Sequence, residues 1–203
     1  MMLVNHTVTD FIDRLASGNP TPGGGSAAAL GGTIAAALTE MVCNLTLDKE
    51  KYAEVQQEIA KVKGICQLHR HRLLELVDED AHAFDQVMAA FKMPKGEGRL
   101  TAIQTGYKLA ASVPLVTAEE CLAVLQQATN IACIGNKNSI TDAGTAAQMA
   151  FAALHSALLN VEINISAIND LNYVRQMRVT INDMKAQAQQ KLSETQSLVH
   201  EAL

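Results

Sequence analysis

The sequence contains no tryptophan, and aromatic residues make up only 3% of its 203 residues. Hydrophobic residues nevertheless account for 48% of the chain. The core must therefore be built from alanine, leucine, isoleucine, valine and methionine. This mixture favours close-packed helices, because β-sheets are enriched in aromatic and β-branched residues. We expect an all-α protein.

The chain also lacks an excess of basic residues, since its formal net charge is −5. Nothing in this charge balance supports binding to nucleic acid. The first residues lack the basic and apolar regions of a signal peptide. The longest apolar stretch, residues 23–38, is shorter than the roughly 20 residues of a bilayer span. We expect a cytoplasmic protein that binds neither nucleic acid nor membrane.

Metal-binding patterns are missing as well. The four cysteines form no C-x-x-C pair, which favours buried, reduced thiols in a cytosolic protein. Glu79 and His82 match one half of the E-x-x-H signature of di-iron bundles, and the required second half is absent. We expect no metal site.

Apolar residues recur at helical spacing along nearly the whole chain, and no alternating run indicates a strand. Pro114 should kink or briefly interrupt the helix in which it lies. Residues 1–203 are therefore expected to form a single domain, a bundle of about five to seven helices. The helical stretches lie at about residues 8–17, 24–47, 52–93, 99–134, 141–168 and 170–203.

The segment PTPGGGS at residues 20–26 precedes an alanine-rich helix. The start of a helix carries unpaired N–H groups and partial positive charge, and glycines let a ligand approach them closely. Gly23, Gly24, Gly25 and Ser26 are therefore candidate substrate-binding residues. The alternative is an ordinary tight turn into a buried helix. Glycines at positions 31 and 32 cost this helix about 2 kcal/mol together, which close helix packing or space for a flat ligand would offset.

An acidic segment, residues 78–85, contains four acids and one histidine. Helical spacing places Asp80 near Leu76, Ala83 and Phe84, and away from Asp78. A carboxyl group buried among apolar neighbours has a raised pKa, which suits acid–base catalysis. The alternative is a solvated acidic face.

Four other polar residues stand out. Asn160 and Asn164 lie one helical turn apart between apolar residues, where they either brace helices or contact a ligand. Asn136 and Asp142 frame another predicted helix start. Asp142 either stabilises the helix dipole or accepts two N–H bonds from a guanidine-like ring edge. Lys49 is either a surface residue or a partner for a carboxylate.

Together these segments resemble the cyclodeaminase/cyclohydrolase family. Its members are the C-terminal domain of formiminotransferase-cyclodeaminase and stand-alone methenyltetrahydrofolate cyclohydrolases. One departure is Asp48, where the family often has glycine, which affects the loop before Lys49. The matching segments are residues 20–29, Met41-Val42 with Leu45-Thr46 and Lys49, Asp78–Phe84, Pro94-Lys95, Val113–Leu115, Gly135-Asn136 with Asp142, and Asn160–Asn164.

The resemblance implies an all-helical homodimer that binds a tetrahydrofolate derivative in a cleft and needs no further cofactor. Asp80 would shuttle a proton or stabilise the cation, and Asp142 would be the second catalytic candidate, at the pterin edge. The glycine-rich segment would pack on the folate or hold a carboxylate, and the three asparagines would orient the substrate.

Three functions remain open at this point. Methenyltetrahydrofolate cyclohydrolase is favoured slightly over formimidoyltetrahydrofolate cyclodeaminase, because no transferase domain is fused in this chain. The third is a non-enzymatic helical interaction module. It explains the amphipathic helices but explains neither the glycines at a helix start nor the paired asparagines.

Overall fold

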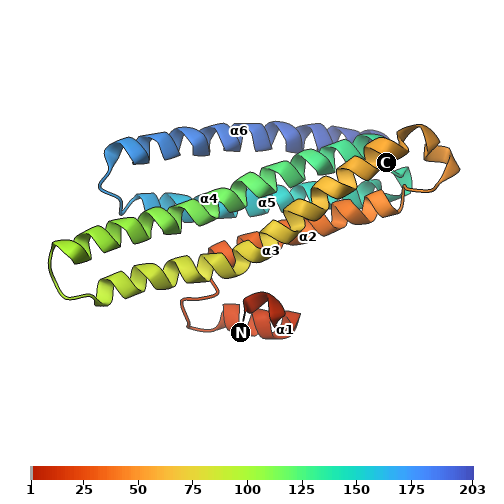
Figure 1. The fold of residues 1–203 in the computed structure, drawn as a ribbon. Helices are drawn as coiled ribbons and strands as arrows, with labels where there is room; N and C mark the ends of the chain where they lie inside the picture. The colour runs from red at the N-terminus through yellow and green to blue at the C-terminus, as the bar shows by residue number, and fades with distance from the viewer. Residues whose placement is uncertain (1) are drawn as a thin grey trace.

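The computed structural model describes residues 2–203, which form six α-helices and no β-strand (Figure 1). The expected all-α, single-domain bundle is confirmed. Three short 3-10 helices, η1 (Leu3–Asn5), η2 (Glu50–Val55) and η3 (Lys137–Ser139), precede α1, α3 and α5. The helices are α1 (Val8–Ala16), α2 (Gly24–Asn44), α3 (Gln56–Lys92), α4 (Glu97–Ile134), α5 (Ile140–Ile165) and α6 (Leu171–Ala202).

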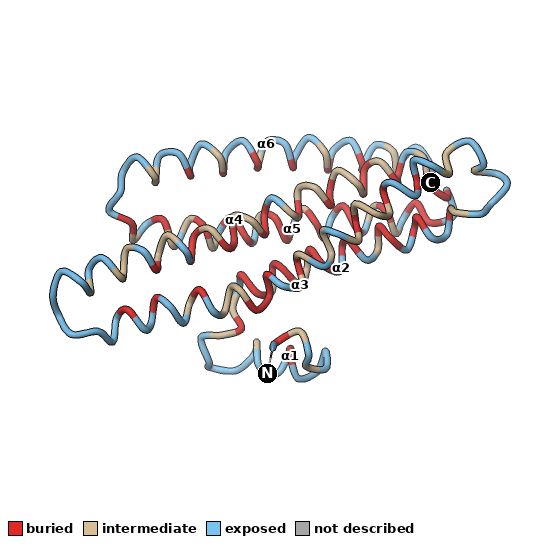
Figure 2. Tube along the Cα trace, in the orientation of Figure 1, coloured by how far each residue is buried: buried red, intermediate tan, exposed pale blue. Residues whose placement is uncertain are grey.

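Four long helices form the centre of the bundle. α2 packs against α3, α4 and α5, and α4 packs against α3 and α5. α6 covers α4 and α5 along one side, and buried positions recur along its inner turns (Figure 2). α1 lies apart from the long helices, near the N-terminus (Figure 1). The candidate site described below lies where α2 begins.

The glycines inside α2 allow close packing. A Cβ atom on Gly32 would lie 2.5 Å from Cys121 Sγ and 3.1 Å from Leu73 Cδ2. Helix α2 therefore approaches α3 and α4 more closely than a larger residue would permit. This close packing offsets the low helix propensity of Gly32, as the sequence led us to expect.

α4 continues through Pro114, so the expected interruption does not occur. Proline has no backbone N–H, and the carbonyl of Ala110 consequently loses its helical donor. Asn164 Nδ2 of α5 donates to this carbonyl at 2.8 Å. Asn164 of α5 therefore supplies the hydrogen-bond donor that Pro114 removes from α4.

The N-terminal segment is attached through Asp78. Its carboxylate accepts hydrogen bonds from the backbone N–H groups of Leu3 at 2.5 Å and Val4 at 3.3 Å. At the start of α1, Thr7 Oγ1 accepts from Asp10 N at 3.1 Å, which is the cap expected from the sequence. Asp78 therefore has a structural role.

Two predictions need adjustment. Three of the four cysteines are buried, but Cys133 is exposed.

Helices α2 and α4 are long and apolar enough to cross a membrane by length and composition, although 61% and 50% of their most apolar windows are buried inside the protein. Core helices of globular proteins share these properties.

Candidate active site

Asp80 of α3 lies against the first turn of α2. Its Oδ2 atom accepts hydrogen bonds from Ser26 N at 2.8 Å and from Ser26 Oγ at 3.0 Å. A Cβ atom on Gly25 would overlap the Asp80 carboxyl group. Glycine is therefore required at this position, because the carboxyl group occupies the space of its missing side chain. The first turn of α2 therefore binds a carboxyl group of the protein itself, and substrate binding by residues 23–26 stays a prediction.

The pKa of Asp80 is raised above its ordinary value, mainly because burial disfavours the charged form. The two hydrogen bonds from Ser26 oppose this effect by stabilising the carboxylate. The net result is an acid that takes up and releases a proton closer to neutral pH than an exposed aspartate does. This property is required of a general acid–base catalyst.

A cleft of about 270 Å³ opens beside Asp80. Phe84, Phe91 and Tyr107 give it an apolar wall, and the rings of Phe91 and Tyr107 meet edge to face with centroids 6.2 Å apart. Sequence reasoning missed this wall. The spacing in the sequence could have indicated it, because Phe84 and Phe91 follow Asp80 by 4 and 11 residues and so lie on the same face of α3. The cleft is lined by Pro20, Thr21, Gly23, Gly24, Gly25, Asp80, Phe84, Val87, Met88, Phe91, Tyr107, Ala110, Asn160 and Asn164.

Asn160 and Asn164 both line this cleft. A Cβ atom on Gly24 would lie 3.3 Å from Asn160 Nδ2, so this amide packs directly on the helix start. Asn160 Nδ2 donates to Ser156 O at 2.9 Å, and Asn164 Nδ2 donates to Asn160 O at 2.8 Å. Asn164 Nδ2 uses both of its N–H groups, since it also donates to Ala110 O, whereas Asn160 Nδ2 makes one bond. Neither Oδ1 atom accepts a hydrogen bond from residues 2–203. The two side chains therefore brace the helices and also line the cleft.

The other predicted site residues lie at the opposite end of α2 and α5. Asn136 Nδ2 donates to Leu45 O at 2.9 Å, and its backbone N–H donates to Thr46 Oγ1 at 2.9 Å. Lys49 is exposed, close in sequence to the end of α2. Asp142 lies in the first turn of α5. Asp142 and Asn160 are 18 residues apart on α5, which corresponds to about 27 Å.

The loop before Lys49 contains Asp48 at φ 59°, the only non-glycine residue with positive φ among residues 2–203. Aspartate tolerates this left-handed conformation better than most residues, and glycine adopts it freely. The backbone here accordingly has the shape that a glycine would favour, although the chain has aspartate.

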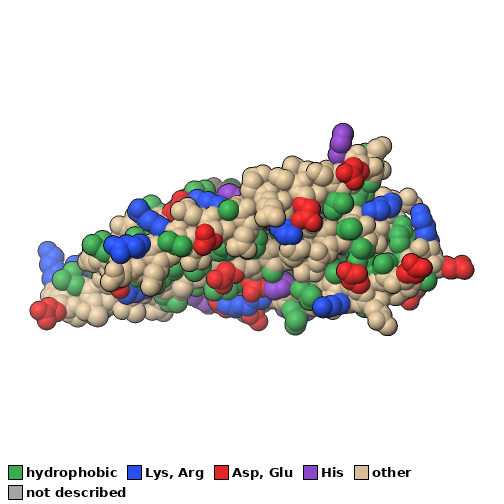
Figure 3. All heavy atoms as spheres, turned by 90° about the horizontal axis from the view of Figure 1, so that it is seen from above, with side chains coloured by type: hydrophobic (Ala, Val, Ile, Leu, Met, Phe, Trp, Pro, Cys, Tyr) green, Lys and Arg blue, Asp and Glu red, His purple; other side chains and the backbone are tan. Residues whose placement is uncertain are grey.

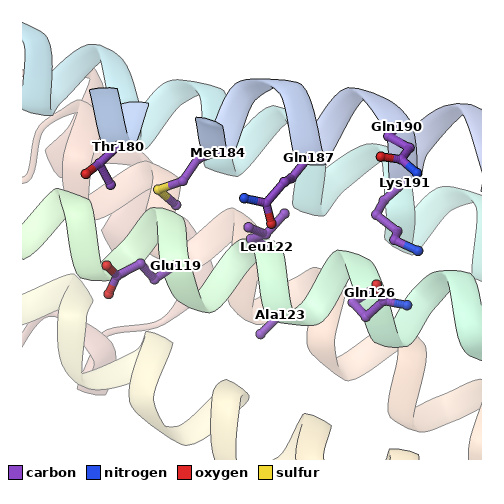
Figure 4. Close-up of a pocket in the computed structure, with 9 residues that line it drawn as sticks. All are labelled: Glu119, Leu122, Ala123, Gln126, Thr180, Met184, Gln187, Gln190 and Lys191. Atoms are coloured by element: carbon purple, nitrogen blue, oxygen red, sulfur yellow. The ribbon is translucent and has the colours of Figure 1, made fainter. Parts of the chain in front are cut away.

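A larger groove of about 510 Å³ lies between α4 and α6 (Figure 4). Figure 4 shows Glu119, Leu122, Ala123 and Gln126 of α4 facing Thr180, Met184, Gln187, Gln190 and Lys191 of α6. None of the predicted site residues lines this groove. We therefore place the candidate active site in the smaller cleft, where a buried acid, a helix start and an aromatic wall meet.

Glu79, the acid of the half motif Glu79-x-x-His82, pairs with an arginine one helical turn and more before it on α3. The Glu79 carboxylate accepts from both Nη atoms of Arg72, at 2.5 and 2.9 Å. His82 is exposed. Among residues 2–203, no three His, Cys, Asp or Glu side chains lie close enough together to hold a metal ion.

The family model of formiminotransferase-cyclodeaminase matches residues 7–183. The methenyltetrahydrofolate cyclohydrolase of Methylorubrum extorquens is 39% identical, over 99% of this chain and 92% of that protein. The formimidoyltransferase-cyclodeaminase of Sus scrofa is 28% identical over 92% of this chain, which spans only 35% of that protein's length. The solved structure of a formiminotetrahydrofolate cyclodeaminase from Thermotoga maritima superimposes with a TM-score of 0.91, at 30% identity and with 97% of each chain covered.

Proposed function

The chain belongs to the formiminotransferase-cyclodeaminase family, and from this premise we propose that it hydrolyses 5,10-methenyltetrahydrofolate to 10-formyltetrahydrofolate. The similarity to a cyclohydrolase along nearly the whole of both chains supports this reaction. The structural observation that carries the proposal is the buried Asp80 carboxyl group beside a cleft with an aromatic wall.

The cleft suits both the flat ring of the substrate and its positive charge. A flat pterin ring packs against Phe84, Phe91 and Tyr107, where aromatic contacts favour planar groups. The methenyl carbon lies between two nitrogens that share a positive charge. A carboxylate at Asp80 stabilises this amidinium cation, and the Oδ1 atoms of Asn160 and Asn164 accept N–H groups of the ring system.

Asp80 also moves the proton. Water adds to the methenyl carbon and loses a proton to the Asp80 carboxylate, which gives a neutral tetrahedral carbon bearing a hydroxyl group. The protonated Asp80 then donates to N5 as the C–N5 bond breaks. The hydroxyl proton leaves to solvent as the formyl C=O forms on N10. Proton transfers of this kind need a group whose pKa is close to the working pH.

The cyclodeaminase reaction is the second candidate, favoured by the similarity to the Thermotoga maritima enzyme. In that reaction N10 of formimino-tetrahydrofolate attacks the formimino carbon, and ammonia leaves. The same acid would donate a proton to the departing nitrogen. The two reactions differ in the nucleophile, because water attacks in one and a folate nitrogen attacks in the other.

We also propose that the protein acts as a homodimer in the cytoplasm, with no cofactor beyond its tetrahydrofolate substrate and no contact with membrane. The outward positions of α2 carry no charged residue, and helices that are apolar on all sides are normally covered. The view from the α6 side shows acidic and basic side chains interspersed along the molecule (Figure 3). A sedimentation measurement is expected to give twice the 21.7 kDa mass of one chain.

The reaction is tested by adding purified protein to methenyltetrahydrofolate and following the loss of its near-ultraviolet absorbance against the uncatalysed rate. Accelerated loss supports the cyclohydrolase. No acceleration, with methenyl product appearing from formimino-tetrahydrofolate instead, identifies a cyclodeaminase. Inactivity with both substrates refutes the proposal and favours the interaction module. Folate binding should also raise the free energy of unfolding, by about 2.7 kcal/mol at one hundred times the dissociation constant.

A further inference from the structure

The cleft beside Asp80 is too small for a whole folate. It measures about 270 Å³, whereas sites for small molecules are typically roughly 300–1,000 Å³. A tetrahydrofolate carries a pterin, an aminobenzoyl group and at least one glutamate, whose carboxylates are charged at neutral pH. The cleft therefore holds the reacting end of the substrate, and the glutamate must lie beyond one of the rims of the cleft.

Two rims of the cleft are open to solvent. The first is the glycine-rich segment before α2, where Pro20 and Gly24 are exposed. The second is the last part of α3, where Met88 and Phe91 are 39% and 41% exposed. Residues 17–26, at the first rim, contain no charged side chain, whereas the second rim continues into a turn that is rich in basic residues. Charge therefore favours the second rim for an anionic group.

The turn between α3 and α4 is basic in an acidic protein. Residues 92–99 contain Lys92, Lys95 and Arg99 and a single acid, Glu97, whereas the whole chain has a net charge of −5. None of these three cations forms an ion pair within residues 2–203. Basic side chains are visible at this end of the molecule, at the left of Figure 3. A cluster of unpaired cations attracts carboxylates.

Arg99 brings this charge to the wall of the cleft. Its Nη2 atom donates to the carbonyl oxygen of Phe91 at 3.0 Å. The centre of its guanidinium group lies 5.9 Å from the centroid of the Phe91 ring. Phe91 itself lines the cleft and meets Tyr107 edge to face. The residue that forms the aromatic wall therefore also holds the guanidinium group at the second rim.

Most of the hydrogen-bonding capacity of Arg99 is unused. A guanidinium group has five N–H donors, and one of them bonds to Phe91. The Nε atom is buried and finds no acceptor in the part of the chain that the structure describes. Buried donors are normally satisfied. A carboxylate bound along the Nε–Nη edge would supply acceptors in the bidentate geometry that arginine favours.

Other candidate cations are already paired or lie far from the cleft. Arg70 and Arg72 are paired with glutamates, at 2.6 and 2.5 Å. Lys49, the predicted partner for a carboxylate, follows the C-terminal end of α2. The 21 residues of that helix place this end about 30 Å from the cleft. Among these candidates, Arg99 alone combines unused donors with contact to a residue of the cleft.

We infer that Arg99 binds a glutamate carboxylate of the substrate at the second rim, and that Lys92 and Lys95 bind the carboxylates of further glutamates joined to the first. The inference rests on the proposed function and specifies which folates the cleft prefers. Asp80 and Phe91 are 11 residues apart on α3, about 16 Å along the helix. The aminobenzoyl and glutamate groups of an extended folate span roughly 12 Å by standard bond lengths, so the side chains of Asp80 and Arg99 can reach the two ends.

The test must separate substrate binding from folding, because Arg99 also caps the last turn of α3 through the Phe91 carbonyl. Three substrates achieve this: methenyltetrahydrofolate with one glutamate, the same compound with three γ-linked glutamates, and an analogue in which an uncharged amide replaces the glutamate. Arg99→Gln should raise KM about 10- to 100-fold for the two glutamate-bearing substrates. The kcat values, and the KM for the analogue, should stay near those of the wild type.

Three further variants sharpen the comparison. Arg178→Gln is the matched control, since Arg178 is exposed on α6, and it should change no KM. Arg99→Lys keeps the charge but loses the planar fork, so its KM should lie between those of the wild type and Arg99→Gln. Combining Lys92→Gln with Lys95→Gln should remove the advantage of three glutamates over one. Added salt should reduce the same advantage in the wild type.

A rise in KM for the analogue as large as that for the natural substrate would show that Arg99 acts only on the fold, and would overturn the inference. An unchanged KM in Arg99→Gln would overturn it too. If the wild type turns over all three substrates with the same KM, the proposed function stands and the glutamate site falls. If the wild type acts only on formimino-tetrahydrofolate, the same comparison is made with that substrate and its glutamate-free analogue. Inactivity with every substrate would refute the proposed function, and the inference with it.

Discussion

Replacing Asp80 with asparagine removes the proton that this side chain carries while preserving its shape. The asparagine Oδ1 atom can still accept the hydrogen bonds that Ser26 N and Oγ donate to Asp80. Gly25 provides the same space for the new side chain. We expect the fold and the cleft to persist, and the change therefore separates chemistry from architecture.

The expected effects on activity and stability have opposite signs. General acid–base catalysis contributes about 10²- to 10⁴-fold to rate, so kcat should fall by that factor, which is about 3–5 kcal/mol in the barrier. Stability should rise, because burial raises the pKa of Asp80 and the folded state is penalised when this group ionises.

The pH dependence follows from the same shift. At low pH Asp80 is protonated in the folded and unfolded states, and the two proteins should unfold with similar Tm. As pH rises, the unfolded chain ionises first, at the ordinary aspartate pKa, and the wild type loses stability until the folded group ionises too. The Tm advantage of Asp80→Asn should therefore grow with pH and level off above the raised pKa.

Two measurements test these expectations. Initial rates on methenyltetrahydrofolate give kcat, and thermal unfolding followed by circular dichroism between acidic and neutral pH gives Tm. Asp183→Asn on the exposed side of α6 is the matched control, and it should change neither quantity. Near-normal activity of Asp80→Asn would refute the catalytic assignment, and a Tm difference that shrinks with rising pH would refute the raised pKa.

Three further predictions concern the surroundings of the site. Gly25→Ala should lower kcat by about 10²-fold, because the added methyl group displaces the carboxyl group of Asp80. As a control, Gly64→Ala should raise the free energy of unfolding by about 0.5–1 kcal/mol, because a Cβ atom at Gly64 would have no other atom within 4 Å. Asn164→Ala should cost about 1–3 kcal/mol in denaturant titrations by leaving a carbonyl unpaired, and this cost should shrink in a Pro114→Ala background, which restores the helical donor. A thiol reagent should modify only Cys133 in the folded protein, because the other three cysteines are buried and their thiol pKa values are raised; a second reactive thiol would contradict this.

Most of the fold was predictable because helices are local. The periodicity of apolar residues predicted all six helices, with each boundary within about four residues of the observed one. It missed the 3-10 turn at Glu50–Val55 and ended α2 three residues late, at Leu47 instead of Asn44. These errors fall at helix ends, where backbone hydrogen bonds outside the helix decide the boundary.

The candidate site was predictable only in part, because its chemistry depends on contacts between distant segments. The sequence indicated that the glycine-rich segment admits an anion and that Asp80 points inward. It did not show that these two features meet, since 54 residues separate Ser26 from Asp80. Similarly, Pro114 and Asn164 were each unusual alone, and only the structure pairs them through the Ala110 carbonyl.

The choice of an acid at position 80 cannot be explained by stability. The first turn of α2 offers two donors, Ser26 N and Ser26 Oγ, and the amide oxygen of an asparagine would satisfy both. Asparagine would also avoid the desolvation cost that raises the pKa of the carboxyl group. An acid at this position is therefore the less stable of two side chains with the same shape. What the acid adds is an exchangeable proton beside a cleft, and that is the property the proposed reaction uses.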